Sequence, residues 1–390
     1  MVNLRSTLKR NTMLIALIVV MLLFEFMIVA TGKGNLFSPS NMTNLILQNS
    51  YVVILSTGML LCILTGGNID LSVGSIVALI GAIAGTLIVN MKVNIYLSIL
   101  ICLIAGLLIG MWQGFWIAYV RIPSFIVTLA GMMLWRGLAL IILNGLTISP
   151  FPEEYLQYFS SYLPVTQNSN TVMAVTVVVG AIVSAIYIVA QIISRAQRVR
   201  KKYAVEGMGI FLGRVIFISA VIMALSILLG QNKGIPVVLI LLSVIVFVYN
   251  YYTQNTVPGR YLYAMGGNEK AAKLSGINTN KTLFFAYTNM AFLSAVAAMV
   301  CIARFNSAAP AAGTNYELDA IGACFIGGAS AYGGTGTVKG AVIGAIFMGV
   351  LNNGMSILGI DANWQKAVKG LVLLAAVIFD VLSKKRAAKA

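Results

Sequence analysis

The sequence has no histidine, few charged residues and only four cysteines among its 390 residues. Without histidine, the chain can have neither His-based acid–base catalysis nor a His-ligated metal site. The cysteines fall within apolar runs and lack CxxC spacing, which indicates small buried side chains (Cys62, Cys102, Cys301 and Cys324). Charged residues make up 9% of the chain and hydrophobic ones 59%. Since a soluble domain is about a quarter charged, most of this chain must face lipid or other apolar helices. We expect an all-α polytopic membrane protein that forms a single transmembrane domain over residues 1–390.

Long apolar runs are what the sequence has in abundance. A bilayer-spanning helix needs about 20 predominantly apolar residues. Twelve stretches come close to this length: 13–31, 49–66, 71–90, 96–119, 123–144, 171–194, 209–230, 235–252, 283–303, 318–333, 338–358 and 363–383. Glycines interrupt the stretch 318–333, which favours a broken or re-entrant helix. We therefore expect about 10–12 transmembrane helices, with an uncleaved first helix at 13–31. Residues 38–50 are predicted to form a short interfacial helix.

The net charge of +16 is distributed in clusters between the apolar runs. This is the positive-inside pattern, and it requires no nucleic-acid partner. Four clusters fall on one side of the predicted topology: residues 5–10, 195–202, 257–283 and 384–389. The other side receives Lys33, Lys92, Lys233, Arg304 and the loop 145–170, which carries two glutamates. The bias predicts that both termini and the loop 257–283 are cytoplasmic, and that the loop 145–170 is periplasmic or extracellular.

The loop 257–283 contains a short capped helix. Asn268 is a plausible N-cap, and Gly276 suits the left-handed position just after the helix. An ordinary loop helix would explain these residues. However, the run Gly-Gly-Asn-Glu-x-Ala-Ala-x-x-Ser-Gly-Ile resembles the coupling loop of the ribose/xylose-type permeases of ABC sugar importers, which a separate ATPase subunit grips. The resemblance implies that ATPase coupling involves Gly267, Asn268, Glu269, Ala271, Ala272, Ser275 and Gly276.

A polar, glycine-containing segment, TGGNIDLSVG, joins two apolar runs at residues 65–74. Polar backbone and a carboxylate at membrane depth are costly unless they are paired or line a cavity. A turn outside the membrane, with Asn68 or Asp70 capping the next helix, is the alternative. Gly-Gly-x-Ile-Asp-Leu-Ser-Val-Gly resembles a signature of the same permeases, where it breaks a helix beside the translocation path. The resemblance implies roles in that path for Asn68, Asp70 and Ser72.

Three further motifs follow the pattern of that family. Ser124 and Thr128 lie four residues apart in a Pro-Ser-Phe-Ile segment, although helix packing also explains them. Glu317 and Asp319 fit helix-start capping, and the nucleophile or metal ligands that an enzyme would require do not accompany them. Asn352 lies in a Leu-Asn-Asn-Gly run. The resemblance places these residues along the path, where polar groups suit an aldose: Ser124, Thr128, Glu317, Asp319, Asn352 and Asn353.

Two further features of the sequence concern the source of energy and an internal repeat. The chain lacks the GxxxxGK[ST] P-loop, so we expect no cofactor in this chain and place ATP and Mg on a partner ATPase. The runs at 66–82 and 333–349 both begin Gly-Gly and continue into small apolar residues, which hints at a two-fold internal repeat.

The resemblance covers residues from about 35 to 383. It implies a non-enzymatic permease subunit in the cytoplasmic (inner) membrane, importing xylose or a related aldose. Its partners would be a cytoplasmic ABC ATPase, a soluble sugar-binding protein and a second permease copy. Two apolar runs at 171–230 depart from the ribose-type pattern and match the longer xylose and multiple-monosaccharide permeases. An ion-coupled secondary transporter remains the alternative, with Glu25 and Asp70 as proton sites.

Overall fold

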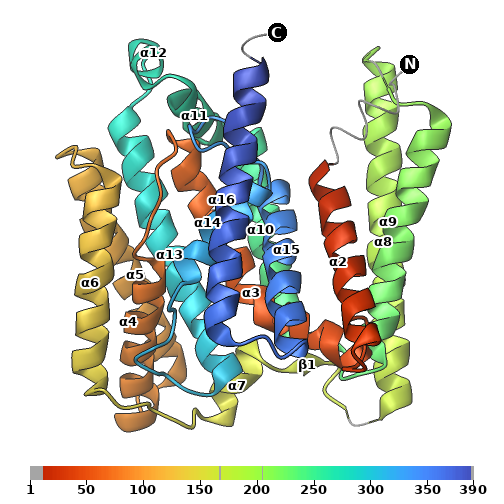
Figure 1. Cartoon of the computed structure of the whole chain (residues 1–390), viewed down its shortest axis with the longest axis horizontal. Coiled ribbons are helices and arrows are strands. Elements are labelled where there is room, and N and C mark those ends of the chain that lie inside the picture. The colour runs from red at the N-terminus through yellow and green to blue at the C-terminus, as the bar shows by residue number, and fades with distance from the viewer. Residues whose placement is uncertain (1–11, 167, 204, 388–390) are drawn as a thin grey trace.

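The computed structural model describes residues 12–166, 168–203 and 205–387, which are almost entirely helical (Figure 1). Within these residues, ten helices are long and apolar enough to cross a membrane. They are α2 (Thr12–Ala30), α3 (Pro39–Leu64), α4 (Val73–Gly85) with its π-helical continuation η1 (Thr86–Asn90), α5 (Ile95–Ala118), α6 (Ser124–Leu143), α8 (Ser169–Arg200), α9 (Met208–Gly230), α10 (Val237–Asn255), α13 (Thr279–Phe305) and α15 (Val338–Ile357). The predicted class, an all-α multi-pass membrane protein, is confirmed.

The remaining elements connect or flank these helices. They are α7 (Glu153–Phe159), α11 (Val257–Gly267), α12 (Glu269–Leu274), α14 (Tyr316–Ile326), α16 (Ala362–Ala387) and an antiparallel pair of two-residue strands, β1 (Tyr162–Leu163) and β2 (Ile235–Pro236). The predicted span 318–333 is represented by α14, which has 11 residues. At 1.5 Å per residue such a helix covers about half of the hydrocarbon thickness. Re-entry and an internal repeat remain predictions.

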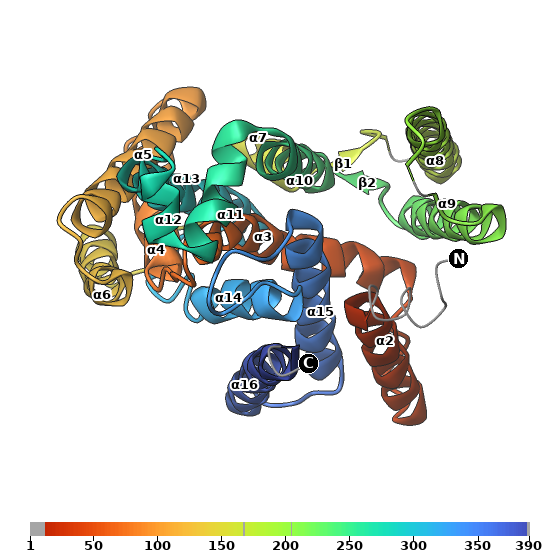
Figure 2. The same ribbon diagram turned by 90° about the horizontal axis from the view of Figure 1, so that it is seen from above.

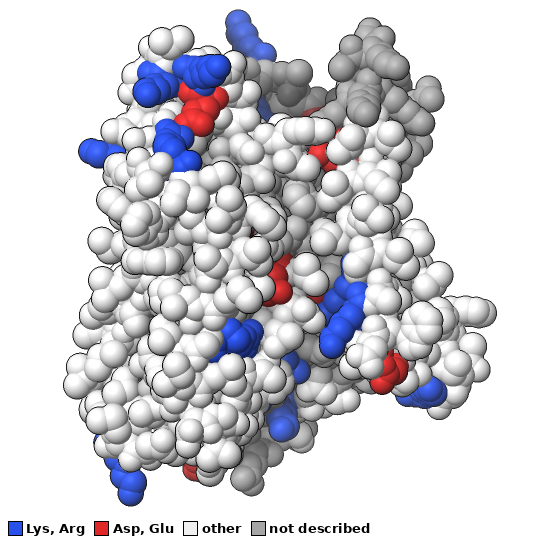
Figure 3. Space-filling view, turned by 60° about the vertical axis from the view of Figure 1, so that its left-hand side comes forward, with Lys and Arg blue, Asp and Glu red and all other residues white. Residues whose placement is uncertain are grey.

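The bundle has two distinct ends. Figure 1 shows α11 and α12 at one end, which we call the α12 end, and α7 at the other, the α7 end. The α8–α9 connection and the C-terminal part of α16 also lie at the α12 end. The predicted basic clusters at 195–202 and 257–283 therefore map to one end, together with the part of the cluster 384–389 up to residue 387. The cluster at residues 5–10 and residues 388–389 lie outside the described residues. In Figure 3, a group of charged side chains gathers over the α12 end, and further charged side chains lie in the hollow at mid-height and toward the opposite end.

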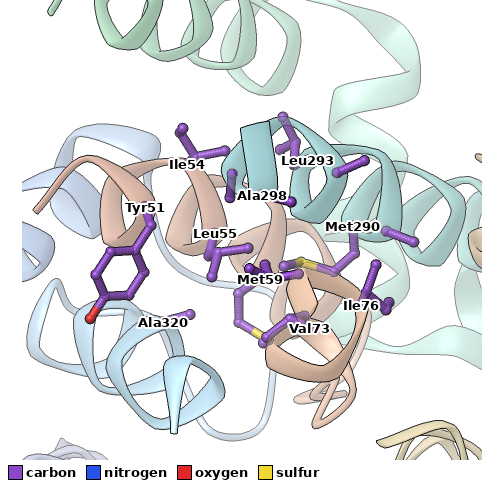
Figure 4. Packing of buried hydrophobic residues seen from close by; sticks show 14 of the residues in the cluster. Tyr51, Ile54, Leu55, Met59, Val73, Ile76, Met290, Leu293, Ala298 and Ala320 are labelled. Atoms are coloured by element: carbon purple, nitrogen blue, oxygen red, sulfur yellow. The ribbon is translucent and has the colours of Figure 1, made fainter. Parts of the chain in front are cut away.

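Helices α3 and α13 form the centre of the core. Their buried side chains interlock with those of α4 and α14, as Figure 4 shows for Leu55, Met59 and Met290. The predicted interfacial helix at 38–50 is wrong, because these residues begin the continuous helix α3. The reason is tertiary: the side-chain amide of buried Asn49 donates a hydrogen bond to the Ala345 carbonyl of α15 at 2.8 Å, which ties this part of α3 into the protein.

Helix α5 packs closely on α13 along a stripe of glycines spaced four residues apart: Gly106, Gly110 and Gly114. A Cβ atom placed on Gly110 would lie 2.7 Å from the Cα atom of Thr288. Lipid tails are as apolar as the side chains, so the hydrophobic effect does not drive membrane helices together. Small residues instead let the helices approach closely and gain van der Waals contact.

Helices α8 and α9 form a hairpin to one side of the molecule (Figure 2). They pack tightly on one another, because a Cβ on Gly180 would lie 2.1 Å from Ser226 Oγ, and one on Gly230 would lie 2.8 Å from Met173 Sδ. This hairpin corresponds to the predicted additional segment at 171–230, and its two helices are among the ten candidate spans.

Candidate translocation and coupling site

The segment between α3 and α4, Thr65–Ser72, is non-helical and is called the polar turn here. Asp70 and Ser72 are completely buried within the protein. Asp70 Oδ1 accepts hydrogen bonds from the Ser72 amide at 2.8 Å and from its hydroxyl at 2.6 Å. In a membrane protein, non-helical backbone between two apolar helices is stable only when it is buried in protein or lines a cavity. The predicted interruption between the two apolar runs is confirmed.

Gln113 of α5 extends this network. Its Nε2 donates to Ser72 Oγ at 2.7 Å. Gly131 of α6 makes room for it, since a Cβ there would lie 2.5 Å from Gln113 Nε2 and 3.1 Å from Trp135 Nε1. Within the described residues, Asp70 Oδ2, Gln113 Oε1 and Trp135 Nε1 are buried without a hydrogen-bond partner. The cluster can therefore offer two acceptors and one donor to a polar solute.

Gln113 is not among the residues predicted from the sequence, where its only signal is that it is an isolated amide within the apolar run 96–119. Thr128, which the sequence did single out, is fully buried on α6, and its hydroxyl reaches only the Phe125 carbonyl at 3.5 Å. Spacing could place Thr128 on a helix face, but could not bring Gln113 to Ser72.

Helices α6 and α13 fasten the polar turn. Ser124 Oγ donates to Asn68 Oδ1 at 3.0 Å, and Asn68 Nδ2 in turn donates to the Thr65 carbonyl at 3.3 Å. The Tyr287 hydroxyl of α13 donates to the Ile69 carbonyl at 3.3 Å. Asn68 and Ser124, predicted from separate motifs, are thus neighbours.

Glu317 borders the same region through the start of α4. Gly74 and Gly313 approach so closely that a Cβ on Gly74 would lie 2.0 Å from the Gly313 carbonyl oxygen and 2.8 Å from Glu317 Oε2. Arg136 of α6, whose partner the sequence left open, donates to the carbonyls of Pro310 at 2.9 Å and Ala312 at 2.5 Å. It thereby holds the loop that precedes α14.

Asp319 belongs to a second cluster. Its carboxylate lies 3.0 Å from Lys369 Nζ of α16 and accepts a hydrogen bond from the Tyr51 hydroxyl of α3 at 2.6 Å. The Tyr51 ring stacks on Tyr316, with centroids 3.8 Å apart. These contacts join α3, α14 and α16.

Asn353 and Asn352 lie in a third cluster. The Asn353 amide exchanges two hydrogen bonds of 3.0 Å with that of Asn41, near the start of α3. Asn352 Oδ1 is buried and has no partner within the described residues. The predicted path residues therefore do not form one cluster. The structure joins only Asn68, Asp70, Ser72 and Ser124 with Glu317 around one turn.

Residues 257–283, called the coupling segment after their predicted role, contain the predicted helix α12. Asn268 Oδ1 caps it by accepting from the Ala271 amide at 3.0 Å, and Gly276 has φ +84° just after its end. Both local predictions are confirmed. Ala272 is buried, whereas Leu274 is 89% exposed, so an apolar side chain projects from the helix. The other predicted coupling residues lie on its surface or are half-buried: Gly267, Glu269, Ala271 and Ser275.

Arg121, which precedes α6, holds α12 in place. Its Nη1 lies 2.6 Å from Glu269 Oε1, and its Nη2 donates to Thr279 Oγ1 at 3.1 Å and to Asn280 Oδ1. Arg121 is in the left-handed region, with φ +66°. The sequence assigned it no role because its partners are far along the chain.

Main-chain contacts link the coupling segment to the polar turn. A Cβ on Gly266 would lie 1.9 Å from the Leu64 carbonyl oxygen and 2.3 Å from the Gly334 nitrogen, and one on Gly333 would lie 2.5 Å from the Cα of Gly66. The Gly334 amide also donates to the Leu64 carbonyl at 3.1 Å. We call Gly66, Gly67, Gly266, Gly333 and Gly334 the glycine junction. Because main-chain atoms of these segments touch directly, no flexible side chain lies between them to absorb a movement of one segment relative to another.

A tyrosine braces this junction from α11. The Tyr263 hydroxyl donates to the Gly336 carbonyl at 3.0 Å and accepts from Gln254 Nε2 at 2.9 Å. Burial raises the pKa of Tyr263 above its ordinary value, so its hydroxyl remains a donor at physiological pH.

Residues 41–377 match the family described as branched-chain amino acid transport system / permease component. The chain belongs to this permease family. The xylose transport system permease protein XylH of Haemophilus influenzae is similar to the permease, with 37% identity over 374 residues, or 96% of each chain. XylH of Escherichia coli K12 is 36% identical over 96% of this chain and 92% of its own. The ribose import permease protein RbsC of the same strain is 33% identical over 376 residues, covering 96% and 95%.

The comparison with solved structures gives no significant match. The relatives are named as transport permeases, and the permease is a transport subunit rather than an enzyme. The polar turn and the glycine junction both fall within the matched residues 41–377.

Proposed function

We propose that the permease is the transmembrane subunit of an ABC importer in the cytoplasmic (inner) membrane that carries a monosaccharide, xylose or a related aldose. The observation that carries this proposal is the glycine junction, which links an exposed helix to a buried polar turn. The names of the relatives, which are xylose and ribose permeases, support the choice of sugar.

The α12 end faces the cytoplasm in this proposal. Its support is the gathering of the basic clusters 195–202 and 257–283 at that end, because cytoplasmic segments carry the excess of Lys and Arg. Both termini are then cytoplasmic, and the loop 145–170 at the α7 end faces outward, where a soluble sugar-binding protein delivers the ligand.

A separate ATPase, which holds ATP and Mg, grips α12. The predicted coupling residues surround a helix whose Leu274 is exposed, and an exposed apolar side chain on a capped helix suits a protein interface. Movement of α12 then reaches the polar turn through Gly266 and Gly334. A second copy of the permease completes the transporter.

The sugar passes the polar turn. Sugars bind through amide, carboxylate and hydroxyl groups beside aromatic rings, and Asp70, Gln113 and Trp135 supply buried groups of these types. Trp135 also packs edge-on against Trp112, with centroids 5.3 Å apart. Glu317, Asp319, Asn352 and Asn353 are proposed to border the path at other depths.

The test is to purify the tagged permease from its native membrane in mild detergent and to identify what accompanies it. A stoichiometric P-loop ATPase, lost when Leu274 is changed to Asp, supports the proposal. A homo-oligomer that contains no ATPase even after crosslinking contradicts it, and favours the ion-coupled carrier with Asp70 as its proton site. A comparison of the uptake of labelled xylose and of labelled ribose by the complex then identifies which sugar it carries.

A further inference from the structure

A cavity of about 440 Å³ opens between the α8–α9 hairpin and the start of α15, at the α12 end. Its lining carries four cations, Arg195, Arg198, Arg214 and Lys339, and one carboxylate, Glu206. Glu206 already lies 3.1 Å from Arg214, and its carbonyl accepts a hydrogen bond from Arg195 at 2.8 Å. With four positive charges against one negative charge, the lining retains three unbalanced positive charges. Such a site attracts a multivalent anion.

A second cavity, of about 340 Å³, lies between α9 and the helices α2, α3, α10 and α15. Its lining is almost wholly apolar and includes Met21, Leu225, Val246, Val342 and Ile346. Asn49 and Ser243 are the polar side chains in that lining, and both already donate hydrogen bonds to main-chain carbonyls.

Helices α9 and α15 line both cavities. On α15, Lys339 lines the cationic cavity, and Val342 and Ile346 line the apolar one. On α9, Arg214 lines the first and Leu225 the second. Both helices run away from the α12 end, so a rise of 1.5 Å per residue places the apolar cavity about 5–15 Å deeper in the membrane. The charged cavity therefore lies closer to the α12 end than the apolar cavity, in the gap that α9 and α15 border.

We propose that this gap binds an anionic phospholipid, with its phosphate among the four cations and an acyl chain in the apolar cavity. Basic pockets between transmembrane helices on the cytoplasmic side suit anionic head groups. Three arginines can bind phosphate oxygens with paired donors. The lipid would join the α8–α9 hairpin to the rest of the permease. A free phosphate ion would satisfy the cations but would leave the apolar cavity without an occupant.

The first experiment measures phospholipid retained by the permease in mild detergent, using native mass spectrometry and a phosphorus assay. The test variant is Arg198→Gln with Lys339→Gln, and the control is Arg200→Gln with Lys201→Gln, which removes the same charge outside the cavity lining. We expect affinity for phosphatidylglycerol to fall by about tenfold or more in the test variant alone. An equal fall in the control would overturn the proposal, because it would show general surface attraction.

The second experiment separates the lipid from a free anion. Leu225→Trp fills the apolar cavity and leaves the cations in place, so it is expected to weaken lipid retention several-fold. Thermal unfolding of the wild-type permease is followed with phosphatidylglycerol, with zwitterionic phosphatidylcholine and with inorganic phosphate. Stabilisation by phosphatidylglycerol alone supports the proposal, even where a variant fails to fold. Equal stabilisation by inorganic phosphate or by phosphatidylcholine contradicts it. None of these readouts depends on sugar transport.

Discussion

Arg121 Nη1 and Glu269 Oε1 lie 2.6 Å apart, so an ion pair joins the segment before α6 to the short helix α12. Both side chains are about two-fifths exposed, at 41% and 42%. Such a pair contributes little to global stability because water screens it. Its value is geometric, since Arg121 also bonds to Thr279 and Asn280 of α13 and so fixes the direction in which α12 points.

Glu269→Arg is expected to uncouple ATP hydrolysis from uptake while the protein stays folded in the membrane. The substitution places two like charges where an ion pair was, and α12 loses its anchor on α6 and α13. ATPase activity and sugar uptake are measured together in proteoliposomes. Glu269→Gln is the milder comparison, because it can still accept from Arg121. Sugar-stimulated uptake at the wild-type ratio in Glu269→Arg would remove α12 from the coupling role.

Gly266→Ala is expected to abolish transport and to destabilise the fold by about 1–3 kcal/mol, the usual cost of overpacking. The added Cβ meets main-chain atoms of Leu64 and Gly334, which cannot rotate away as a side chain can. Gly213→Ala on α9 is the control, because a Cβ there has no neighbour within 4 Å. Thermal unfolding and uptake are compared, and wild-type values for both in Gly266→Ala would contradict the tight junction.

Gly110→Val is expected to lower the unfolding temperature by separating α5 from α13, again at a cost of about 1–3 kcal/mol. A Cβ at residue 110 lies 2.7 Å from both the Cα and the carbonyl oxygen of Thr288. Gly137→Val on α6 is the matched substitution in open space. If both variants unfold at the same temperature, the glycine stripe does not set the distance between the helices.

Lys369→Met is expected to destabilise the permease by about 3–5 kcal/mol, because it leaves a buried charge uncompensated. Asp319 is 2% exposed on its side chain and Lys369 16%. Adding Asp319→Asn should recover most of the loss, since the unpaired charge is then absent. Unfolding in denaturant measures both variants. If Lys369→Met unfolds like the wild type, Asp319 is not held by this pair, and its role in the path gains weight.

Gln113→Leu is expected to reduce sugar uptake by about tenfold, since one lost hydrogen bond to a buried polar group costs roughly 1–3 kcal/mol. The substitution removes the donor to Ser72 and the acceptor that has no protein partner. Gln191→Leu on α8 controls for the loss of an amide elsewhere. Unchanged uptake together with unchanged co-purification of the ATPase would place the path away from α5.

Features that depend on neighbouring residues could be predicted from the sequence. The cap at Asn268 and the left-handed Gly276 depend on residues three to five positions away, and both are confirmed. Most spans follow from apolar length alone. The beginning of α3 differs from the prediction because its polar residues resemble those of an interfacial helix, whereas the Asn49 amide donates to the Ala345 carbonyl of α15, 296 residues later.

The partners within the candidate site could not be predicted. Ser72 and Gln113 are 41 residues apart, Arg121 and Glu269 are 148 apart, and Asn41 and Asn353 are 312 apart. No local pattern encodes such pairs. The motif resemblance assigned Asp70 and Asp319 the same role in the path. Contacts in the fold distinguish them, because Asp70 has an oxygen with no hydrogen-bond partner among the described residues, whereas Asp319 is paired with Lys369.

The glycine junction also constrains how the protein is made. It needs main chain from residues 64–67, 266 and 333–334, so it cannot form until the last of these has left the ribosome and entered the membrane. Until then the polar turn is held only by contacts within residues made earlier, such as the hydrogen bonds of Ser72 with Asp70 and Gln113. A nascent chain that stops short of Gly333 can bring Gly266 to Leu64, but it lacks the contacts of Gly333 with Gly66 and of Gly334 with Leu64. The complete glycine junction is therefore among the last parts of the permease to be assembled.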